Sequence, residues 1–266
     1  MNILLTNDDG IEAPGLEALV GCFRSQEKWD SEKHFELLVT APANEKSASS
    51  HSISLGEKLR VEEYVSKNLL HYKVHGTPAD CVKFALSEIK DFAPDLIISG
   101  INQGANTGVS VYYSGTISAA REGLINRVPS MAVSLCSPPV RQAGKTSQDF
   151  SACVSIVSSL VEGYRASLFP LEIMLNVNVP ALNPDEIKGI KITKQAASHF
   201  IEEFVPQKAH DGKKIYTLAG QMELYDTDGA SDEEAVAQGF ISVTPLKLDL
   251  THYESIPVFE KWVKTL

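Results

Sequence analysis

The sequence lacks the features that would place this chain in a membrane, on a nucleic acid or in a disulfide scaffold. No apolar run approaches the roughly 18 residues that span a bilayer, and the N-terminal apolar stretch ends at Leu5, too early for a signal peptide. The formal net charge is −10, without a basic cluster that could follow a nucleic-acid backbone. The four cysteines contain no CxxC pair and indicate free thiols. We therefore expect a soluble cytoplasmic protein that binds neither membranes nor long nucleic acids.

Several common catalytic motifs are also missing. The chain contains no GxxxxGK[ST], no HExxH and no GxSxG, which argues against P-loop NTPases, zinc proteases and α/β-hydrolases. Its seven histidines show no metal-ligand spacing.

Apolar segments that alternate in type predict an α/β fold. Short buried strands are expected at 3–5, 36–40, 96–98, 131–135 and 173–179, with helices at 16–23, 77–89, 116–126 and 148–165. Thr77-Pro78-Ala79-Asp80 is typical of a helix start with a capping box. The order predicts a Rossmann-like, mostly parallel sheet with helices on both faces. The looser alternation over 51–74 predicts a β-ribbon that projects from this sheet.

The pattern changes after Pro180. Strand-like segments at 190–193, 214–218 and 241–250 are separated by polar loops, and a closing helix is expected over 255–266. We expect residues 1–180 to form an α/β core that carries the functional site, and residues 181–266 to form a β-rich extension. Because long ribbons with little core of their own usually need a partner, this extension is expected to exchange between subunits.

The most informative residues are Asn7-Asp8-Asp9-Gly10, which directly follow the first strand. Open α/β sheets bind ligands at this carboxyl edge. Two adjacent carboxylates repel each other by roughly 4 kcal/mol at about 4 Å and an effective dielectric near 20. A divalent cation with oxygen ligands relieves that repulsion. The same four residues also suit a plain turn, so the tetrapeptide alone leaves both interpretations open.

Further polar groups follow later strands. Loops after successive parallel strands meet at one edge, so Ser47 and Asn102 can join Asp8 and Asp9. Their neutral oxygens would complete a set suited to magnesium or manganese. The start of the next helix offers N–H groups and hydroxyls for a phosphate, and the predicted phosphate-binding residues are Asn106, Ser114, Gly115 and Thr116. Each of these segments also has an ordinary explanation as a turn, a solvated loop or a helix cap.

A cation beside a phosphate seat suits phosphomonoester hydrolysis. Asp8 and Asp9 are the catalytic candidates, with Asp8 placed to accept a proton from the attacking water. Adjacent aspartates differ from the Asp-x-Asp of haloacid-dehalogenase phosphatases, which argues against an aspartyl intermediate. The segment 226–233 is interpreted as an acidic loop, because an EF-hand would need glycine at Ser231 and glutamate at Ala237.

Five ordered motifs resemble the SurE family, the stationary-phase survival proteins that are metal-dependent 5′/3′-nucleotidases. They are Ile3–Gly10 with Ala13-Pro14-Gly15, Ala41–Ser47, His75–Val82, Ser99–Asn106 and Tyr113–Thr116, and Gly239–Leu246 resembles the family's closing strand. The resemblance covers nearly the whole chain and places the metal ligands on Asp8, Asp9, Ser47 and Asn102. The chain departs from the usual pattern at Ala43-Asn44, where the family often carries a charged pair.

The resemblance implies hydrolysis of nucleoside 5′- and 3′-monophosphates to nucleoside and phosphate, with short-chain polyphosphate as a possible further substrate. It implies one magnesium or manganese ion per subunit, and a homodimer or homotetramer built through an exchanged C-terminal ribbon. Two alternatives are a signalling receiver domain and a nucleotide-binding regulator without catalysis. A receiver needs a phosphoacceptor aspartate after a later strand, and the segment Ser99–Asn102 supplies none.

Overall fold

The computed structural model describes residues 1–29, 34–136, 149–208, 213–225 and 228–266. Nine strands of this described part form one sheet. In chain order they are β1 (Asn2–Thr6), β2 (Glu36–Pro42), β3 (Val61–Ser66), β4 (Leu69–Val74), β5 (Leu96–Gln103), β6 (Ser130–Cys136), β7 (Met174–Pro180), β8 (Ile190–Ile192) and β11 (Ile241–Leu246). A separate hairpin consists of β9 (Ser198–Gln207) and β10 (Ile215–Leu224).

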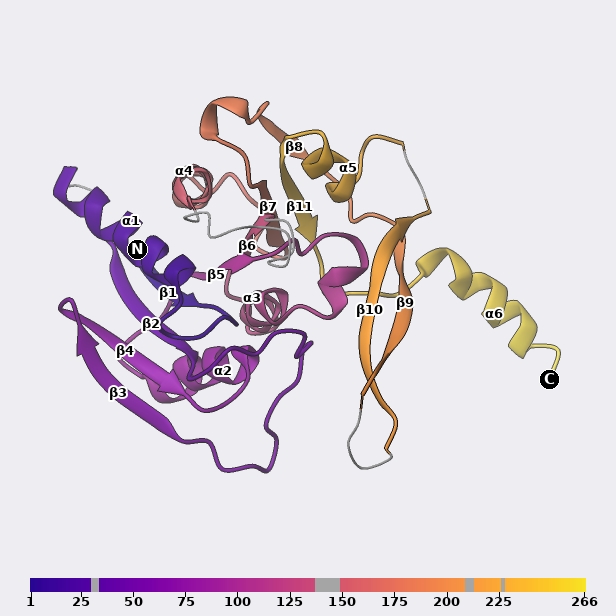
Figure 1. Ribbon diagram of the computed structural model, residues 1–266, viewed down its shortest axis with the longest axis horizontal. Coiled ribbons are helices and arrows are strands. Elements are labelled where there is room, and N and C mark those ends of the chain that lie inside the picture. The colour runs from indigo at the N-terminus through magenta and orange to yellow at the C-terminus, as the bar shows by residue number, and fades with distance from the viewer. Residues whose placement is uncertain (30–33, 137–148, 209–212, 226–227) are drawn as a thin grey trace.

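The helices are α1 (Pro14–Trp29), α2 (Pro78–Glu88), α3 (Gly115–Ile125), α4 (Ser151–Arg165), α5 (Asp232–Ala237) and α6 (Ile256–Val263), and the short 3-10 helix η1 (Gly108–Tyr112) precedes α3. The sheet has the order β3-β4-β2-β1-β5-β6-β7-β11-β8. Its neighbouring strands run parallel except for the pairs β3–β4 and β7–β11. Figure 1 shows helices on both faces of this sheet. The predicted mostly parallel α/β fold is therefore confirmed.

The first strand shows why both faces are covered. Successive side chains of a strand point to opposite faces, so Ile3 and Leu5 pack with α1 and α4, while Leu4 packs with α2 and α3. All three side chains are fully buried. A strand that is buried on both faces reads as a continuous apolar run, which is why 3–5 could be recognised in the sequence.

The predicted capping box at the start of α2 is present. Asp80 N–H donates to Thr77 Oγ1 at 3.1 Å, and Thr77 N–H donates to Asp80 Oδ2 at 2.8 Å. Pro78 occupies the first turn, where it removes no helical hydrogen bond. This helix start was predictable because every group that caps it lies within four consecutive residues.

The segment 51–74 differs from its prediction as a projecting ribbon. Strand β4 pairs in parallel with β2, so β3 and β4 form the edge of the main sheet. They are joined by Lys67 and Asn68, which both have positive φ, at 50° and 58°. The sequence offered no glycine to mark this two-residue turn, and the pairing with β2 is a long-range contact that periodicity does not report.

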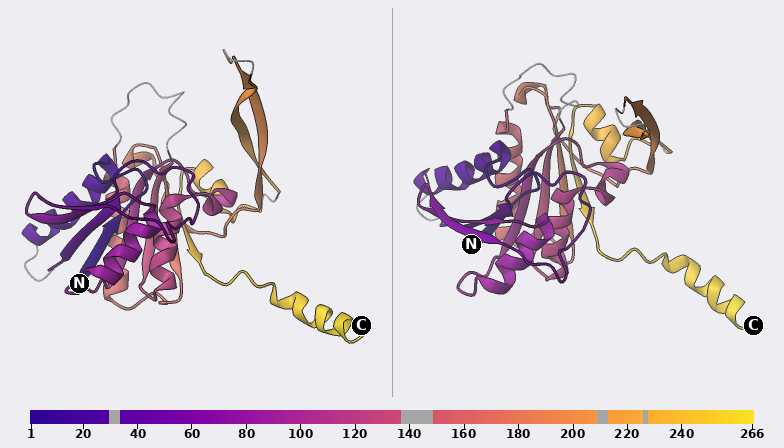
Figure 2. Two further views of the ribbon diagram at one scale, coloured as in Figure 1. Left: turned by 90° about the horizontal axis from the view of Figure 1, so that it is seen from below. Right: turned by 60° about the horizontal axis from the view of Figure 1, so that its bottom comes forward.

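The part of the chain beyond residue 180 divides between the sheet and two projections. Strands β8 and β11 join the main sheet, whereas the β9–β10 hairpin and the C-terminal arm, residues 247–266, extend from the body (Figures 1 and 2). The strands expected at 190–193, 214–218 and 241–250 are present as β8, β10 and β11, although β11 already ends at Leu246. The closing helix is present as α6, whereas β9 and α5 were not predicted. The boundary proposed at residue 180 stays a prediction.

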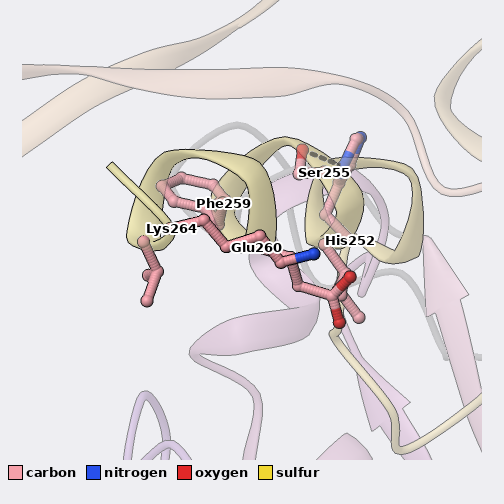
Figure 3. Close-up of a pocket in the computed structure, with 7 residues that line it drawn as sticks. His252, Ser255, Phe259, Glu260 and Lys264 are labelled. Carbon is pink, nitrogen blue, oxygen red and sulfur yellow. Dashed lines mark hydrogen bonds between the residues drawn. The ribbon is translucent and has the colours of Figure 1, made fainter. Parts of the chain in front are cut away.

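The arm carries a shallow depression that is lined only by residues between His252 and Lys264 (Figure 3). Its apolar groups include Phe259, which is 64% exposed. This hollow is formed by one helix and its preceding turn, and it lies away from the candidate residues of the first loop. Within the described residues, no helix combines the length and apolarity that crossing a bilayer requires.

Candidate metal centre

The tetrapeptide after β1 forms a tight turn closed by Asn7. Gly10 N–H donates to Asn7 Oδ1 at 3.2 Å, and Asn7 Nδ2 donates to Gly10 O at 2.8 Å. Gly10 has a φ of +107°, which an L side chain rarely adopts. The turn and the metal interpretations are therefore compatible, because the turn holds Asp8 and Asp9 at the carboxyl edge of the sheet.

Asp8 is 4% exposed and is held by the start of α3. Thr116 Oγ1 donates to Asp8 Oδ1 at 2.5 Å. A Cβ added to Gly115 would lie 2.7 Å from Asp8 Cβ, so only glycine lets the helix approach this closely. Burial raises the pKa of Asp8 above its ordinary value, although the hydroxyl and backbone of Thr116 favour the ionised form.

Asp9 is the second carboxyl group of the site. Its pKa is raised to about 7, first by burial and then by the charge of Asp8, against a hydrogen bond from the backbone of Gln103. Asp9 Oδ2 is buried and has no hydrogen-bond partner. Among the described residues, neither carboxylate forms a salt bridge. No cationic side chain of the described residues therefore neutralises these two carboxylates.

The loop after β2 brings Ser47 to the first loop. Lys46 N–H donates to Asp8 O at 2.8 Å, so the residue before Ser47 is fixed to the backbone of the first aspartate. Ser47 is exposed, and its hydroxyl donates to Glu45 Oε1 at 2.5 Å. Ala48 and Ser50 both have a φ of 54°, a strained conformation for residues with a side chain.

The same loop is tied to α2 and α3 farther along. Ser50 N–H donates to Tyr113 O at 2.9 Å, just before α3. His51 Nε2 lies 3.0 Å from Glu122 Oε2, and Lys83 Nζ donates to Glu122 Oε1 at 2.7 Å. Glu122 is 1% exposed, so this buried carboxylate on α3 anchors the loop that carries Ser47.

The end of β5 supplies Asn102. The pairing of β5 with β6 shifts its register between Ser99 and Asn102, which interrupts the regular strand at this point. Asn102 Nδ2 donates to Gly104 O at 2.8 Å, and within the described residues its Oδ1 accepts no hydrogen bond and can act as a ligand. The neighbouring backbone of Gln103 is bonded to Asp9. The structure thus brings three loops together around Asp8 and Asp9.

The predicted phosphate residues are largely engaged with the protein itself. Asn106 Nδ2 donates to Ser134 Oγ at 2.9 Å and to Thr116 Oγ1 at 3.4 Å. Ser114 Oγ accepts from Ile117 N–H at 3.1 Å as the N-cap of α3. Thr116 is bonded to Asp8, as described above. Phosphate binding by Asn106, Ser114, Gly115 and Thr116 stays a prediction, and Thr116 gains a second role beside Asp8.

Other residues of the site were not found from the sequence. Asn178 Oδ1 accepts from Asn106 N–H at 2.9 Å, and Asn176 Nδ2 donates to Asn106 O at 2.7 Å. Both belong to β7, where two asparagines at a spacing of two must share one face of an apolar strand. That spacing was a usable signal. Glu45, beside Ser47, gave no comparable signal.

The acidic segment late in the chain is not a simple loop. Ser231 caps α5, and Asp232 is fully buried, where it accepts N–H groups from Gly108 and Ala196. These contacts tie the base of the β9–β10 hairpin to η1. The interpretation of the whole segment as an acidic loop is wrong for Asp232, because backbone donors satisfy its buried charge; residues 226 and 227 lie outside the described residues.

The donor set fits a hard divalent cation. In the described part of the chain, no three His, Cys, Asp or Glu residues form a metal-binding group. The carboxylates of Asp8 and Asp9 and the neutral oxygens of Ser47 and Asn102 are all oxygen donors, the kind that hard divalent cations prefer. The unpartnered Asp9 Oδ2 is the atom that such an ion would satisfy.

Comparison with known proteins gives consistent matches. The family model described as survival protein SurE matches residues 3–202. A protein named 5′-nucleotidase SurE from Syntrophobacter fumaroxidans is 41% identical, covering 98% of this chain and 99% of the relative. One of the same name from Vibrio cholerae is 40% identical, covering 99% and 98%. The crystal structure of a SurE protein from Aquifex aeolicus matches with a TM-score of 0.79 and 33% identity, covering 98% of this chain and 99% of that chain.

Proposed function

The chain belongs to the survival protein SurE family and is a nucleotidase, and we propose that its Asp8–Asp9 centre works with a divalent cation to dephosphorylate nucleoside monophosphates. The resemblance seen in the five sequence motifs is confirmed. The proposal extends to 5′- and 3′-nucleotides as substrates, to short-chain polyphosphate as a further substrate, and to magnesium or manganese as the cation.

The observation that carries this proposal is a pair of adjacent carboxylates, one buried and one half-buried, without a cationic partner among the described residues. Asp8 and Asp9 both have a raised pKa, and Asp9 Oδ2 has no partner at all. Such a pair is costly to keep ionised unless something else supplies positive charge. Because metal ligation requires the deprotonated carboxylates, binding of the cation should release protons near neutral pH.

The residues around the pair have separate tasks in the proposed reaction. When bound, the cation polarises the phosphoryl group and lowers the pKa of a coordinated water. Asp8, fixed by Thr116 and Gly115, accepts the proton of the attacking water. The N-terminus of α3 presents its positive end beside Asp8, where it favours the anionic phosphate.

The test is phosphate release from a panel of 5′- and 3′-nucleoside monophosphates and from short polyphosphate, with and without a chelator. We expect release that stops with chelator and returns with magnesium or manganese. Release that persists in chelator would contradict the metal-dependent mechanism. A receiver domain would instead take up phosphate from a small phosphodonor, and a regulator would bind nucleotide without releasing phosphate.

We also place the enzyme in the cytoplasm as a homodimer or homotetramer. All four cysteines are free thiols, which fits a reducing compartment. The C-terminal arm and the β9–β10 hairpin expose large apolar side chains, including Phe204, Leu218, Phe259 and Trp262. Such exposed groups on projecting elements mark a surface for a second copy. Light scattering of the full chain and of a Phe259→Asp variant tests this, and a monomeric full chain would contradict it.

A further inference from the structure

Ser47 is the weakest of the four candidate ligands. Its hydroxyl is neutral, rotates freely about one bond and sits on an exposed residue, whereas Asp8 is charged and buried. A hydroxyl binds a cation through a lone pair, so its proton must point elsewhere. The structure shows where it points, because Ser47 Oγ donates to Glu45 Oε1 at 2.5 Å.

The backbone holds Glu45 and Ser47 in this relationship. The residue between them, Lys46, donates its N–H to Asp8 O at 2.8 Å. Glu45 and Ser47 therefore flank a residue whose backbone is hydrogen-bonded to the backbone of Asp8. The position of Ser47 relative to Asp8 is set by the backbone, and its hydroxyl rotamer is set by Glu45.

Glu45 also acts on the two aspartates through its charge. Its carboxylate contributes to the raised pKa of Asp8 and to that of Asp9, after burial in both cases. A charge that is felt by both aspartates is also felt by a cation held between them. Three carboxylates attract a divalent ion more strongly than two, even though Glu45 itself is exposed.

We propose that Glu45 is a positioning residue of the metal centre, which orients the Ser47 hydroxyl toward the cation and adds a third negative charge to its surroundings. This inference rests on the proposed metal-dependent function. Groups that orient metal ligands in this way typically change metal affinity by about 10- to 100-fold when they are removed. A purely local role for Glu45, as a cap of its own loop, would leave metal affinity unchanged.

The experiment measures binding of manganese alone to the full-length protein, by the electron paramagnetic resonance signal of the free ion. We expect Glu45→Gln, which keeps an acceptor but removes the charge, to weaken binding about 10-fold, and Glu45→Ala to weaken it further. The control Glu172→Gln removes the same charge from an exposed position just before the amino end of β7, whereas Glu45 follows the carboxyl end of β2. It should bind manganese as the wild type does.

A double-mutant cycle with Ser47→Ala shows whether Glu45 acts through Ser47. The two losses should be less than additive, because the second substitution removes an interaction that is already broken. The midpoint of urea unfolding of Glu45→Gln should match that of wild type, which separates a change in the metal centre from a loss of folding.

Two results overturn the inference and are distinguishable. Wild-type affinity in both Glu45 variants would remove Glu45 from the centre while leaving the proposed function intact. No manganese binding by the wild type would overturn the metal centre itself, and this inference with it.

Discussion

Thr116 Oγ1 donates a hydrogen bond to Asp8 Oδ1 across 2.5 Å, which fixes the first turn of α3 to the first carboxylate of the site. The two residues are 108 positions apart in the chain. The helix that would receive the phosphate and the strand end that would hold the cation are therefore one rigid unit. Substitutions can separate the contributions of the helix and of the strand end.

The contact between Gly115 and Asp8 predicts a large effect of one added methyl group. In Gly115→Ala, the new Cβ would lie 2.7 Å from Asp8 Cβ, so α3 or the first loop must move. A displacement of about 1 Å can lower catalysis on the order of 100-fold, and we expect kcat/KM to fall by that amount. The control is Gly21→Ala at an exposed position of α1, where no atom lies within 4 Å of the added Cβ. It should raise the free energy of unfolding by roughly 0.5–1 kcal/mol without changing kinetics.

Substitutions at Thr116 separate two roles of its hydroxyl. Thr116→Val leaves Asp8 Oδ1 without this donor, whereas Thr116→Ser keeps the hydroxyl. We expect Thr116→Val to destabilise the protein by about 1–3 kcal/mol and to weaken manganese binding, with Thr116→Ser close to wild type. The measurements are urea unfolding and metal titration. A rise in KM with unchanged metal affinity would instead favour a direct contact between Thr116 and phosphate.

The buried anchor at Glu122 predicts a specific response to acid. Burial alone would raise its pKa, but hydrogen bonds from His51, Lys83 and Asn126 hold it below the ordinary value of 4.5. Because the pKa is lower in the folded state, the resulting stability is present above about pH 4.5 and is lost as the pH falls through the folded pKa. The free energy of unfolding of Glu122→Gln, measured with urea between about pH 3 and pH 7, should therefore fall less steeply toward acid pH than that of wild type.

At neutral pH, Glu122→Gln should lower the free energy of unfolding by about 1–3 kcal/mol. The substitution replaces one carboxylate oxygen, an acceptor, by an NH₂ group that faces other hydrogen-bond donors. Glu88→Gln, at an exposed position of α2, is the matched control and should follow the wild-type pH profile. If the free energy of unfolding of Glu122→Gln fell as steeply toward acid pH as that of wild type, the hydrogen bonds to this carboxylate would not stabilise the protein.

The strained loop beside Ser47 predicts a stabilising glycine. Ala48 has a φ of 54°, a conformation that costs L residues about 1–2 kcal/mol and glycine much less. Ala48→Gly should raise the free energy of unfolding by roughly 0.5–1 kcal/mol, because the added freedom of the unfolded glycine offsets part of the gain. Ala43→Gly, in the same loop without a positive φ, should lower it by a similar amount. A loss of stability in Ala48→Gly would mean that this loop is not strained at Ala48.

Much of the fold could be predicted because its signals are local. Strand β1 is a continuous apolar run, and the cap of α2 lies within four residues. The strand β9 could not be predicted, since an exposed ribbon needs no regular burial pattern; its half-buried and exposed residues occur in blocks and do not alternate. Helix α5 is six residues long and too short to show a period.

The site also has features that could be predicted from the sequence and features that could not. Parallel topology alone sends the loops after β1, β2 and β5 to one edge, so their convergence followed from the order of the strands. The partner of Thr116 did not follow, because a hydrogen bond between distant residues leaves no pattern in the sequence. The link from Asp232 to Gly108 was hidden for the same reason, and the acidic composition around it pointed to solvent.

If the C-terminal arm mediates the proposed self-association, its exposure depends on the concentration of the protein. Trp262 and Phe259 are more than half exposed, and they belong to a helix that stands apart from the body of its own chain (Figures 1 and 2). Under the proposed self-association, the protein concentration determines the fraction of chains in which these side chains are exposed to water. At low concentration, the monomer would expose this apolar helix to surfaces and chaperones. At high concentration, self-association would bury it.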